Sequence, residues 1–289
     1  MTETTTRTVG EGDDAITYDV HGDLATARPD RPPLFLFAAP MEASAFAQLA
    51  AHFGDRPVVT YDPRGAARNP RGTADITAAQ HADDLHRVIA ALGGGPVDAF
   101  GSSGGGVNLL ALLAAHPDDV RIAVVHEPAT AALLDDRDTV LAVVDDLKST
   151  YAAHGQGAAV AKFISLVMFD GPIGSDYLDR PAPDPAMFGL PAIDDGSRTD
   201  PLFRNMPSVI EYEPDLDALR ALGDRLVLAF GAQSGETMAA RAARAVAAAV
   251  GIEPTRFPSH HGGFVDGPGM PGDPDAFAAR LREVLDARS

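Results

Sequence analysis

Residues 97–117 read VDAFGSSGGGVNLLALLAAHP, and this stretch decides the fold. An apolar run at 97–100 leads into Gly101-Ser102-Ser103-Gly104-Gly105, and a helical pattern follows. Gly-x-Ser-x-Gly between a strand and a helix predicts a sharp turn that strains its central serine, while the flanking glycines let neighbouring backbone pass closely. The sequence therefore predicts that Ser103 is a nucleophile raised above the end of a strand.

A glycine-rich helix start is the alternative interpretation of this stretch. Because the chain holds 28 Gly, the bare motif arises by chance roughly 0.1 times in such a sequence. The strand before the motif and the helix after it weaken that explanation. A phosphate-binding loop is excluded because no Gly-Lys-Ser/Thr follows.

Strand and helix patterns alternate on both sides of this turn. Continuous apolar runs at 34–37, 58–61, 122–125 and 226–231 are typical of strands that are covered on both faces. Helical periodicity at 76–92 indicates a crossover helix. The sequence therefore predicts an α/β fold with a mostly parallel, doubly wound sheet.

One long segment interrupts this alternation. Residues 131–219 carry two helical stretches and then a passage rich in Pro, Gly and Asp, after which strand and helix patterns resume. We therefore expect residues 1–130 and 220–289 to form one core, with residues 131–219 inserted as a helical lid or cap.

Composition excludes several classes of function. The 289-residue chain has no Cys, so disulfides, thiolate metal sites and a cysteine nucleophile are excluded. Its formal charge of -18 repels nucleic acid and anionic membranes. We expect a small-molecule substrate and neither a nucleic-acid nor a membrane partner, and a homodimer stays open.

Location and cofactors are expected from what the sequence lacks. The first residues carry no basic start followed by an apolar run, and no stretch offers 18 uninterrupted apolar residues, so the default location is the cytoplasm. No dinucleotide or nucleotide fingerprint occurs. Adjacent aspartates, which could suggest metal ligands, occur at 83–84, 135–136, 145–146 and 194–195, but such pairs are typical of solvated helix faces and turns. We therefore expect no cofactor and no metal.

Several motifs together give the chain a family resemblance. Ala38-Ala39-Pro40-Met41 follows the first apolar run, Tyr61-Asp62-Pro63-Arg64-Gly65 follows the second, and His261-Gly262-Gly263-Phe264 precedes the closing helix. In this order, with Gly-x-Ser-x-Gly between them, they resemble the α/β-hydrolase fold superfamily over nearly the whole chain. The segments at 40–46 and 58–70 are similar to actinobacterial serine hydrolases with helical lids.

The resemblance implies a serine hydrolase that cleaves an ester, lactone or related acyl bond through an acyl-enzyme on Ser103. It makes His261 the general base in preference to the adjoining His260, because His261 has the family's spacing to Phe264. The backbone N–H groups of Ala39 and Gly104 would form the oxyanion hole. Phe37 and Ala38 stand where many members carry His-Gly, which is a departure from the family pattern.

The acid of the implied catalytic triad is the residue that departs most from the pattern. Ser234 occupies the usual aspartate position after the run at 226–231, and a serine cannot stabilise an imidazolium as a carboxylate does. Glu127, after the run at 122–125, matches the arrangement in another branch of the superfamily and is our first choice. Glu236 is the second, and a purely structural role for Glu127 stays open.

The lid implies a substrate pocket for a small to medium, partly apolar substrate. We expect the side chains that line it to include Met41, Ser102, Met168, Phe169, Phe188, Met206 and Tyr212. Packing inside the lid is the alternative for the aromatic and Met side chains. Three other functions stay open: acyl transfer or cyclisation, a cofactor-free haloperoxidase or lyase reaction, and ligand binding by a catalytically impaired member.

Overall fold

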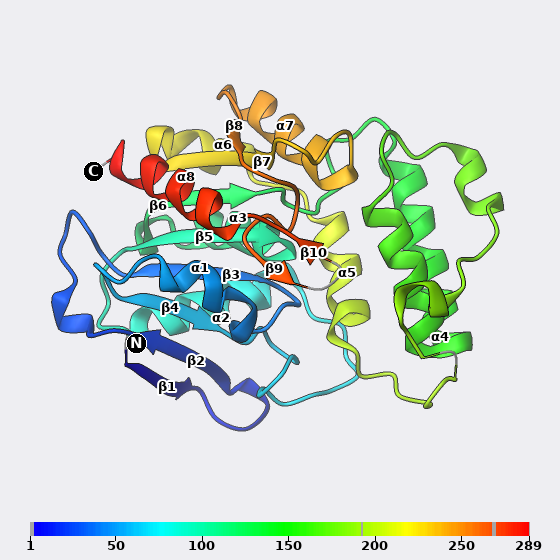
Figure 1. The fold of residues 1–289 in the computed structure, drawn as a ribbon, viewed down its shortest axis with the longest axis horizontal. Coiled ribbons are helices and arrows are strands. Elements are labelled where there is room, and N and C mark those ends of the chain that lie inside the picture. The colour runs from blue at the N-terminus through cyan, green and yellow to red at the C-terminus, as the bar shows by residue number, and fades with distance from the viewer. Residues whose placement is uncertain (1–2, 192, 268–269, 289) are drawn as a thin grey trace.

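An eight-stranded sheet in the order β1-β2-β4-β3-β5-β6-β7-β8 forms the centre of the molecule (Figure 1). The structure is a computed structural model that describes residues 3–191, 193–267 and 270–288. The strands of this sheet are β1 (Thr4–Val9), β2 (Ile16–His21), β3 (Leu34–Ala39), β4 (Val58–Tyr61), β5 (Val97–Ser103), β6 (Val120–His126), β7 (Leu226–Gly231) and β8 (Thr255–Phe257). The strands from β4 to β8 in this order pair in parallel, and β1 and β2 run antiparallel at one edge. The predicted α/β class with a mostly parallel sheet is confirmed.

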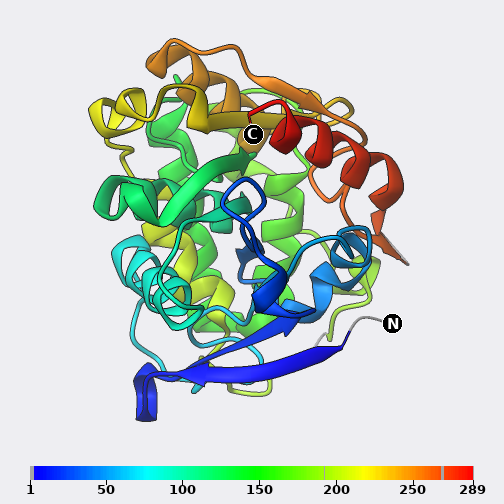
Figure 2. The ribbon, with the colours of Figure 1, turned by 90° about the vertical axis from the view of Figure 1, so that its left-hand side faces the viewer.

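Helices cover both faces of the sheet, as its unbroken apolar strands require. The α-helices of the described residues are α1 (Ala47–Ala51), α2 (Ala78–Ala91), α3 (Gly104–Ala115), α4 (Arg137–Val167), α5 (Pro201–Glu211), α6 (Leu216–Ala221), α7 (Met238–Val250) and α8 (Pro274–Asp286), and α4 does not lie on either face. Side chains of α2, α3 and α7 share one hydrophobic cluster with the sheet, and those of α1 and α8 share another with its opposite face. Figure 2 shows the red α8 and the cyan-to-teal α2 and α3 on opposite sides of the strands.

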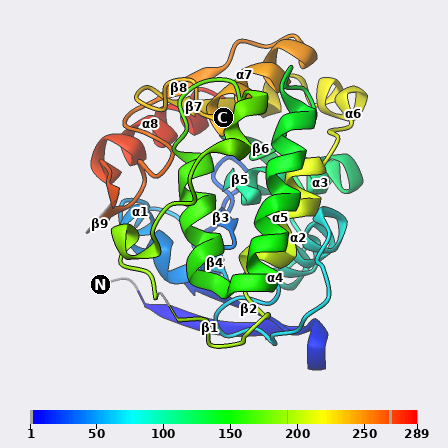
Figure 3. The ribbon, with the colours of Figure 1, turned by 90° about the vertical axis from the view of Figure 1, so that its right-hand side faces the viewer.

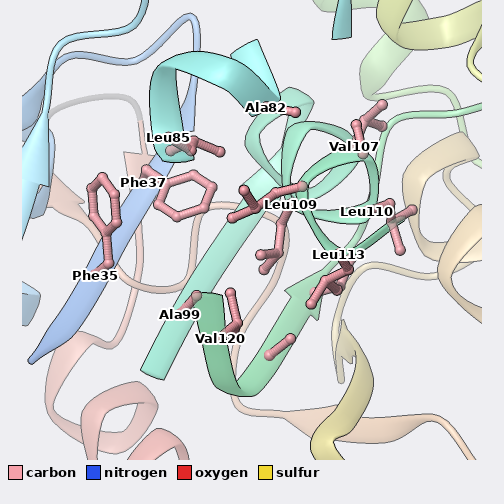
Figure 4. Packing of buried hydrophobic residues seen from close by; sticks show 14 of the residues in the cluster. Phe35, Phe37, Ala82, Leu85, Ala99, Val107, Leu109, Leu110, Leu113 and Val120 are labelled. Atoms are coloured by element: carbon pink, nitrogen blue, oxygen red, sulfur yellow. The ribbon is translucent and has the colours of Figure 1, made fainter. Parts of the chain in front are cut away.

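The packing of α3 positions the segment that carries the motif. Figure 4 shows Leu109 of α3 beside Phe37 of β3, with Leu85 of α2 close by. These side chains are fully buried, so the helix is held firmly against the strand from which it emerges. The N-terminus of α3 is thereby fixed at the carboxyl end of β5.

The segment between β6 and β7 lies beyond the carboxyl ends of the strands. Figure 3, a view from that end, shows α4 in front of the sheet, and Figure 1 shows α5 between α4 and the rest of the molecule. Helix α4 is interrupted at Gly155, whose φ of 78° is not helical. Helix α6, which spans the predicted end of the insertion, packs against α3 and α7 on the sheet. Within the described residues, no helix is both long and apolar enough to cross a membrane.

Gly105, in the first turn of α3, allows this helix to approach β3. A Cβ atom built on Gly105 would lie 2.5 Å from the Cα of Ala38, a distance that requires the backbone to move. We expect Gly105→Ala to lower the free energy of unfolding by about 1 to 3 kcal/mol, as overpacking does in tight cores. Denaturant unfolding followed by circular dichroism measures this change.

Gly54→Ala is the matched control for this substitution. Gly54 is exposed, and a Cβ atom there would have no neighbour within 4 Å. Its free energy of unfolding should stay within about 0.5 kcal/mol of wild type. Equal stability of the Gly105 and Gly54 variants would show that the close approach of α3 to β3 contributes nothing.

Candidate active site

The candidate site residues come from the ends of neighbouring strands. Ser103 is the last residue of β5, Glu127 directly follows β6, and His261 lies in the loop after β8. Because β5, β6, β7 and β8 are adjacent and parallel, their carboxyl ends meet at one edge of the sheet. Ligands of open α/β sheets bind in the crevice at this edge.

Ser103 has the backbone conformation that the motif predicts. Its φ of 57° and ψ of -126° lie in a region that residues other than glycine seldom adopt. Such a conformation costs of the order of 1 to 3 kcal/mol and persists only where the surroundings impose it. Here the buried end of β5 and the first turn of α3 impose it, so the hydroxyl is held between strand and helix.

His261 and Glu127 form a direct hydrogen-bonded pair. The distance from Nδ1 of His261 to Oε2 of Glu127 is 2.6 Å, and the backbone N–H of Gly231 donates to the other oxygen, Oε1, at 2.8 Å. The Glu127 side chain is fully buried, whereas that of His261 is 40% exposed. Since a carboxylate only accepts, His261 donates through Nδ1 and leaves Nε2 free to accept a proton.

The charge of Glu127 is stabilised despite its burial. Burial alone would raise the pKa of this carboxyl, but the hydrogen bond from His261 and neighbouring charges lower it to about 2. The carboxylate is therefore ionised throughout the neutral range and holds the ring of His261 in one orientation and tautomer.

The alternative residues at this edge have other partners. Glu236 is 62% exposed and forms an ion pair with Arg244 at 2.8 Å, away from the imidazole. The ring of His260 is held within its own loop, with Nδ1 accepting from the backbone of Gly262 and Nε2 hydrogen-bonded to the carbonyl of Pro271. The structure thus brings Glu127, and not Glu236, to His261.

A buried histidine, His126, lies behind this pair and was not expected from the sequence. Burial lowers its pKa to about 4, so the ring is neutral at neutral pH. Its Nδ1 is 3.1 Å from the hydroxyl of Ser102, and its ring packs against Phe100 and Phe277. Ser102 is therefore committed to the interior and lies beneath the surface on which Ser103 is presented.

Ser103 and His261 open into one cavity beneath the insertion. The cavity has a volume of about 50 Å³. Its lining residues are Ala39, Pro40, Ser103, Gly104, Ala129, Phe163, Leu166, Val167, Leu202, Asn205, Met206, Val209, Ile210, Thr237, Met238, Ala239 and His261. This lining is mostly apolar and holds no Lys, Arg, Asp or Glu. Ala39 and Gly104, the expected oxyanion-hole residues, lie beside Ser103, and Ala39 is paired with it between β3 and β5.

Several other side chains expected around the substrate lie outside this lining. Met168 is 69% exposed at the end of α4, and Phe169 packs edge-on against Tyr177 at 5.3 Å within the insertion. Phe188 is half-buried on a short 3-10 turn, and Met41 packs beside the cluster that α1 and α8 cover. None of the four, nor Ser102, borders the cavity.

A large part of the lining comes from helices of the expected lid, and among the expected residues Met206 borders the cavity while Tyr212 does not. Helix α5 contributes five residues that recur at helical spacing, namely Leu202, Asn205, Met206, Val209 and Ile210. The period of 3.6 residues in PLFRNMPSVIE was the signal that could have identified this face. The end of α4 and the start of α7, with Thr237 just before it, supply half of the rest.

One group of side chains in the described residues could hold a metal ion. It comprises His86, His116 and Asp119, whose potential ligand atoms lie within 4.8 Å of one another. His86 is hydrogen-bonded to Asp119 at 2.6 Å and stacked on His116. The group lies at the far end of α3, about 18 Å along the helix from Ser103. It is therefore separate from the cavity.

Comparison with known proteins agrees with this fold. A family model described as "alpha/beta hydrolase fold" matches residues 36–176. The chain is 27% identical over 232 residues to a protein named "Uncharacterized hydrolase YraK" from Bacillus subtilis (strain 168), an alignment that covers 77% of this chain and 79% of that protein.

Solved structures show the same arrangement over nearly the whole chain. The enol-lactonase from Burkholderia xenovorans LB400 superposes with a TM-score of 0.66 at 18% identity, covering 94% of this chain and 96% of that one. A hydrolase from Pseudomonas aeruginosa PA01 also gives 0.66, at 22% identity, covering 97% and 98%. At these identities the likeness concerns the fold alone.

Proposed function

Since the chain belongs to the α/β-hydrolase fold superfamily, we propose that it is a serine hydrolase that cleaves an ester, lactone or related acyl bond. One observation carries the proposal. The strained Ser103 shares a cavity with His261, and the ring of His261 is hydrogen-bonded to the buried Glu127. These three residues have the roles of nucleophile, base and acid in a triad.

The first half of the proposed reaction forms an acyl-enzyme. Nε2 of His261 takes the proton of the Ser103 hydroxyl as its oxygen attacks the substrate carbonyl. The C=O electrons move onto the oxygen, and the N–H groups of Ala39 and Gly104 stabilise that oxyanion. When the oxyanion collapses, the bond to the leaving group breaks, and His261 returns its proton to the departing oxygen.

The second half releases the acyl group. His261 deprotonates a water molecule that attacks the acyl carbonyl, and the bond to Ser103 breaks with return of the proton to its oxygen. The negative charge of Glu127 stabilises the imidazolium that forms in both halves. The cycle uses only side-chain and backbone groups of this protein and water.

The composition of the cavity supports a neutral, partly apolar substrate of small to medium size. Its lining contains aliphatic and aromatic carbon and no Lys, Arg, Asp or Glu. The positive charge that His261 gains during the reaction is the exception. We further propose that residues 131–219 act as a lid, because α4 and α5 supply a large part of that lining.

Labelling with a fluorophosphonate probe tests the proposed nucleophile. Phosphonylation should add one probe to the protein, and peptide mapping should place it on Ser103 rather than on the adjacent Ser102, which is buried. Hydrolysis of p-nitrophenyl esters with acyl chains of two to ten carbons, followed in parallel, should be abolished by labelling. An unlabelled protein, or an adduct elsewhere, would contradict the proposal.

A further inference from the structure

A buried amide interrupts the apolar wall of the cavity. Asn205 is 2% exposed and sits in the middle of the α5 stripe, between Leu202 and Val209. Residues at this spacing share one helix face, so the amide lies on the same face as the aliphatic lining. Its Nδ2 has no hydrogen-bond partner among the described residues.

His81 of α2 fixes the orientation of this amide. Nε2 of His81 is 2.8 Å from Oδ1 of Asn205, and His81 is completely buried. Burial lowers the pKa of His81, although the bond to Asn205 opposes this, so the ring is neutral at neutral pH. An amide oxygen only accepts, so His81 donates through Nε2. Oδ1 is therefore occupied, and Nδ2 is the end of the amide that stays free.

The lack of a hydrogen-bond partner for Nδ2 of Asn205, in the buried wall of the cavity, requires an explanation. A buried donor without an acceptor costs about 1 to 3 kcal/mol, and native proteins keep few of them. Thr237, which also lines the cavity, has a second unpartnered polar atom, Oγ1, at the start of α7. Two unpaired polar atoms around one apolar cavity indicate a ligand that supplies their partners.

We propose that Asn205 forms a polar subsite that binds a second, neutral acceptor oxygen of the substrate through Nδ2. The inference rests on the proposed serine hydrolase function and names the substrate class: acyl compounds that carry a ketone, ester or amide carbonyl besides the scissile one. A carboxylate is disfavoured, because the lining has no Lys or Arg to compensate its desolvation.

Matched pairs of esters with and without the second carbonyl test the subsite. On the acyl side, p-nitrophenyl 4-oxohexanoate and 5-oxohexanoate are compared with p-nitrophenyl hexanoate. On the alcohol side, 2-oxobutyl butyrate is compared with butyl butyrate. In at least one pair, kcat/KM of wild type should favour the oxo ester by about tenfold or more, and Asn205→Leu should lower that preference by about 10- to 100-fold.

Two further variants separate the subsite from a structural role. Asn205→Asp keeps an acceptor for His81 but removes the donor, so the oxo preference should disappear in it as well. Met206→Leu, on the same stripe, should change both members of a pair alike. The inference is overturned if both Asn205 variants keep the wild-type preference within twofold, or if wild type shows no preference in any pair.

A binding measurement tests the subsite independently of turnover. Calorimetry with Ser103→Ala measures the dissociation constants of the same esters, and the oxo esters should bind more tightly only while Asn205 is present. Hydrolysis of plain esters without any oxo preference refutes the subsite and leaves the proposed function intact. Preferential binding by a wild-type protein that hydrolyses no ester refutes the proposed function and supports the subsite.

Discussion

Replacing Ser103 with alanine is expected to lower kcat for ester hydrolysis by about 10⁴- to 10⁶-fold. The hydroxyl forms the covalent intermediate, and no neighbouring side chain can replace it, because the chain has no Cys and the adjacent Ser102 is buried against His126. Steady-state and burst kinetics with a p-nitrophenyl ester measure the loss.

The control for this experiment is another serine to alanine change. Ser149 is exposed on α4, where its hydroxyl donates to the carbonyl of Asp145. Ser149→Ala should therefore keep the wild-type rate. Both variants should unfold near the wild-type denaturant concentration, since each loses one hydroxyl. Undiminished hydrolysis by the Ser103 variant would remove this residue from the reaction.

Exchanging Glu127 for glutamine is expected to lower kcat by about 10⁴-fold, the size of effect known for amide replacement of a triad carboxylate. Glutamine has only one acceptor oxygen, while His261 and the backbone of Gly231 both donate to the native carboxylate. If the amide nitrogen of glutamine donates to Nδ1, the neutral ring of His261 must carry its proton on Nε2 instead. Nε2 can then no longer accept the proton of Ser103.

Glu236→Gln is the matched control, because it makes the same chemical change at an exposed ion pair with Arg244. Its kcat should stay within about twofold of wild type, since exposed pairs contribute little. Rates of both variants are compared at neutral pH, where Glu127 with its pKa of about 2 is fully ionised. A larger loss in the Glu236 variant would reassign the acid.

Much of the fold could be predicted because its strands are buried on both faces. The apolar runs at 58–61 and 226–231 coincide with β4 and β7, and those at 34–37 and 97–100 extend into β3 and β5. The strands β1 and β2 were not predicted from the sequence. The exposed, threonine-rich β1 has no apolar alternation, and its strand conformation depends on pairing with β2.

The residues at strand ends were easier to predict than the cavity wall. Ser103 and Glu127 directly follow strong strand signals, which limits where they can sit, whereas His261 was chosen by its family spacing to Phe264. The wall depends on how α4 and α5 pack over the sheet. Helical periodicity marks the apolar face of α5 but does not specify what that face covers. Met168 illustrates this, because it ends the apolar stretch of α4 but points into solvent, while Phe163 of the same helix lines the cavity.

The placement of Ser103, Glu127 and His261 at strand ends has a consequence for how the chain tolerates changes in length. One residue added within β5, β6 or β8 would shift the following side chain by about 3.3 Å and turn it to the opposite face. The segment between β6 and β7 is attached after Glu127 and is free of that constraint. Insertions and deletions there can reshape the cavity wall while the reacting groups keep their spacing.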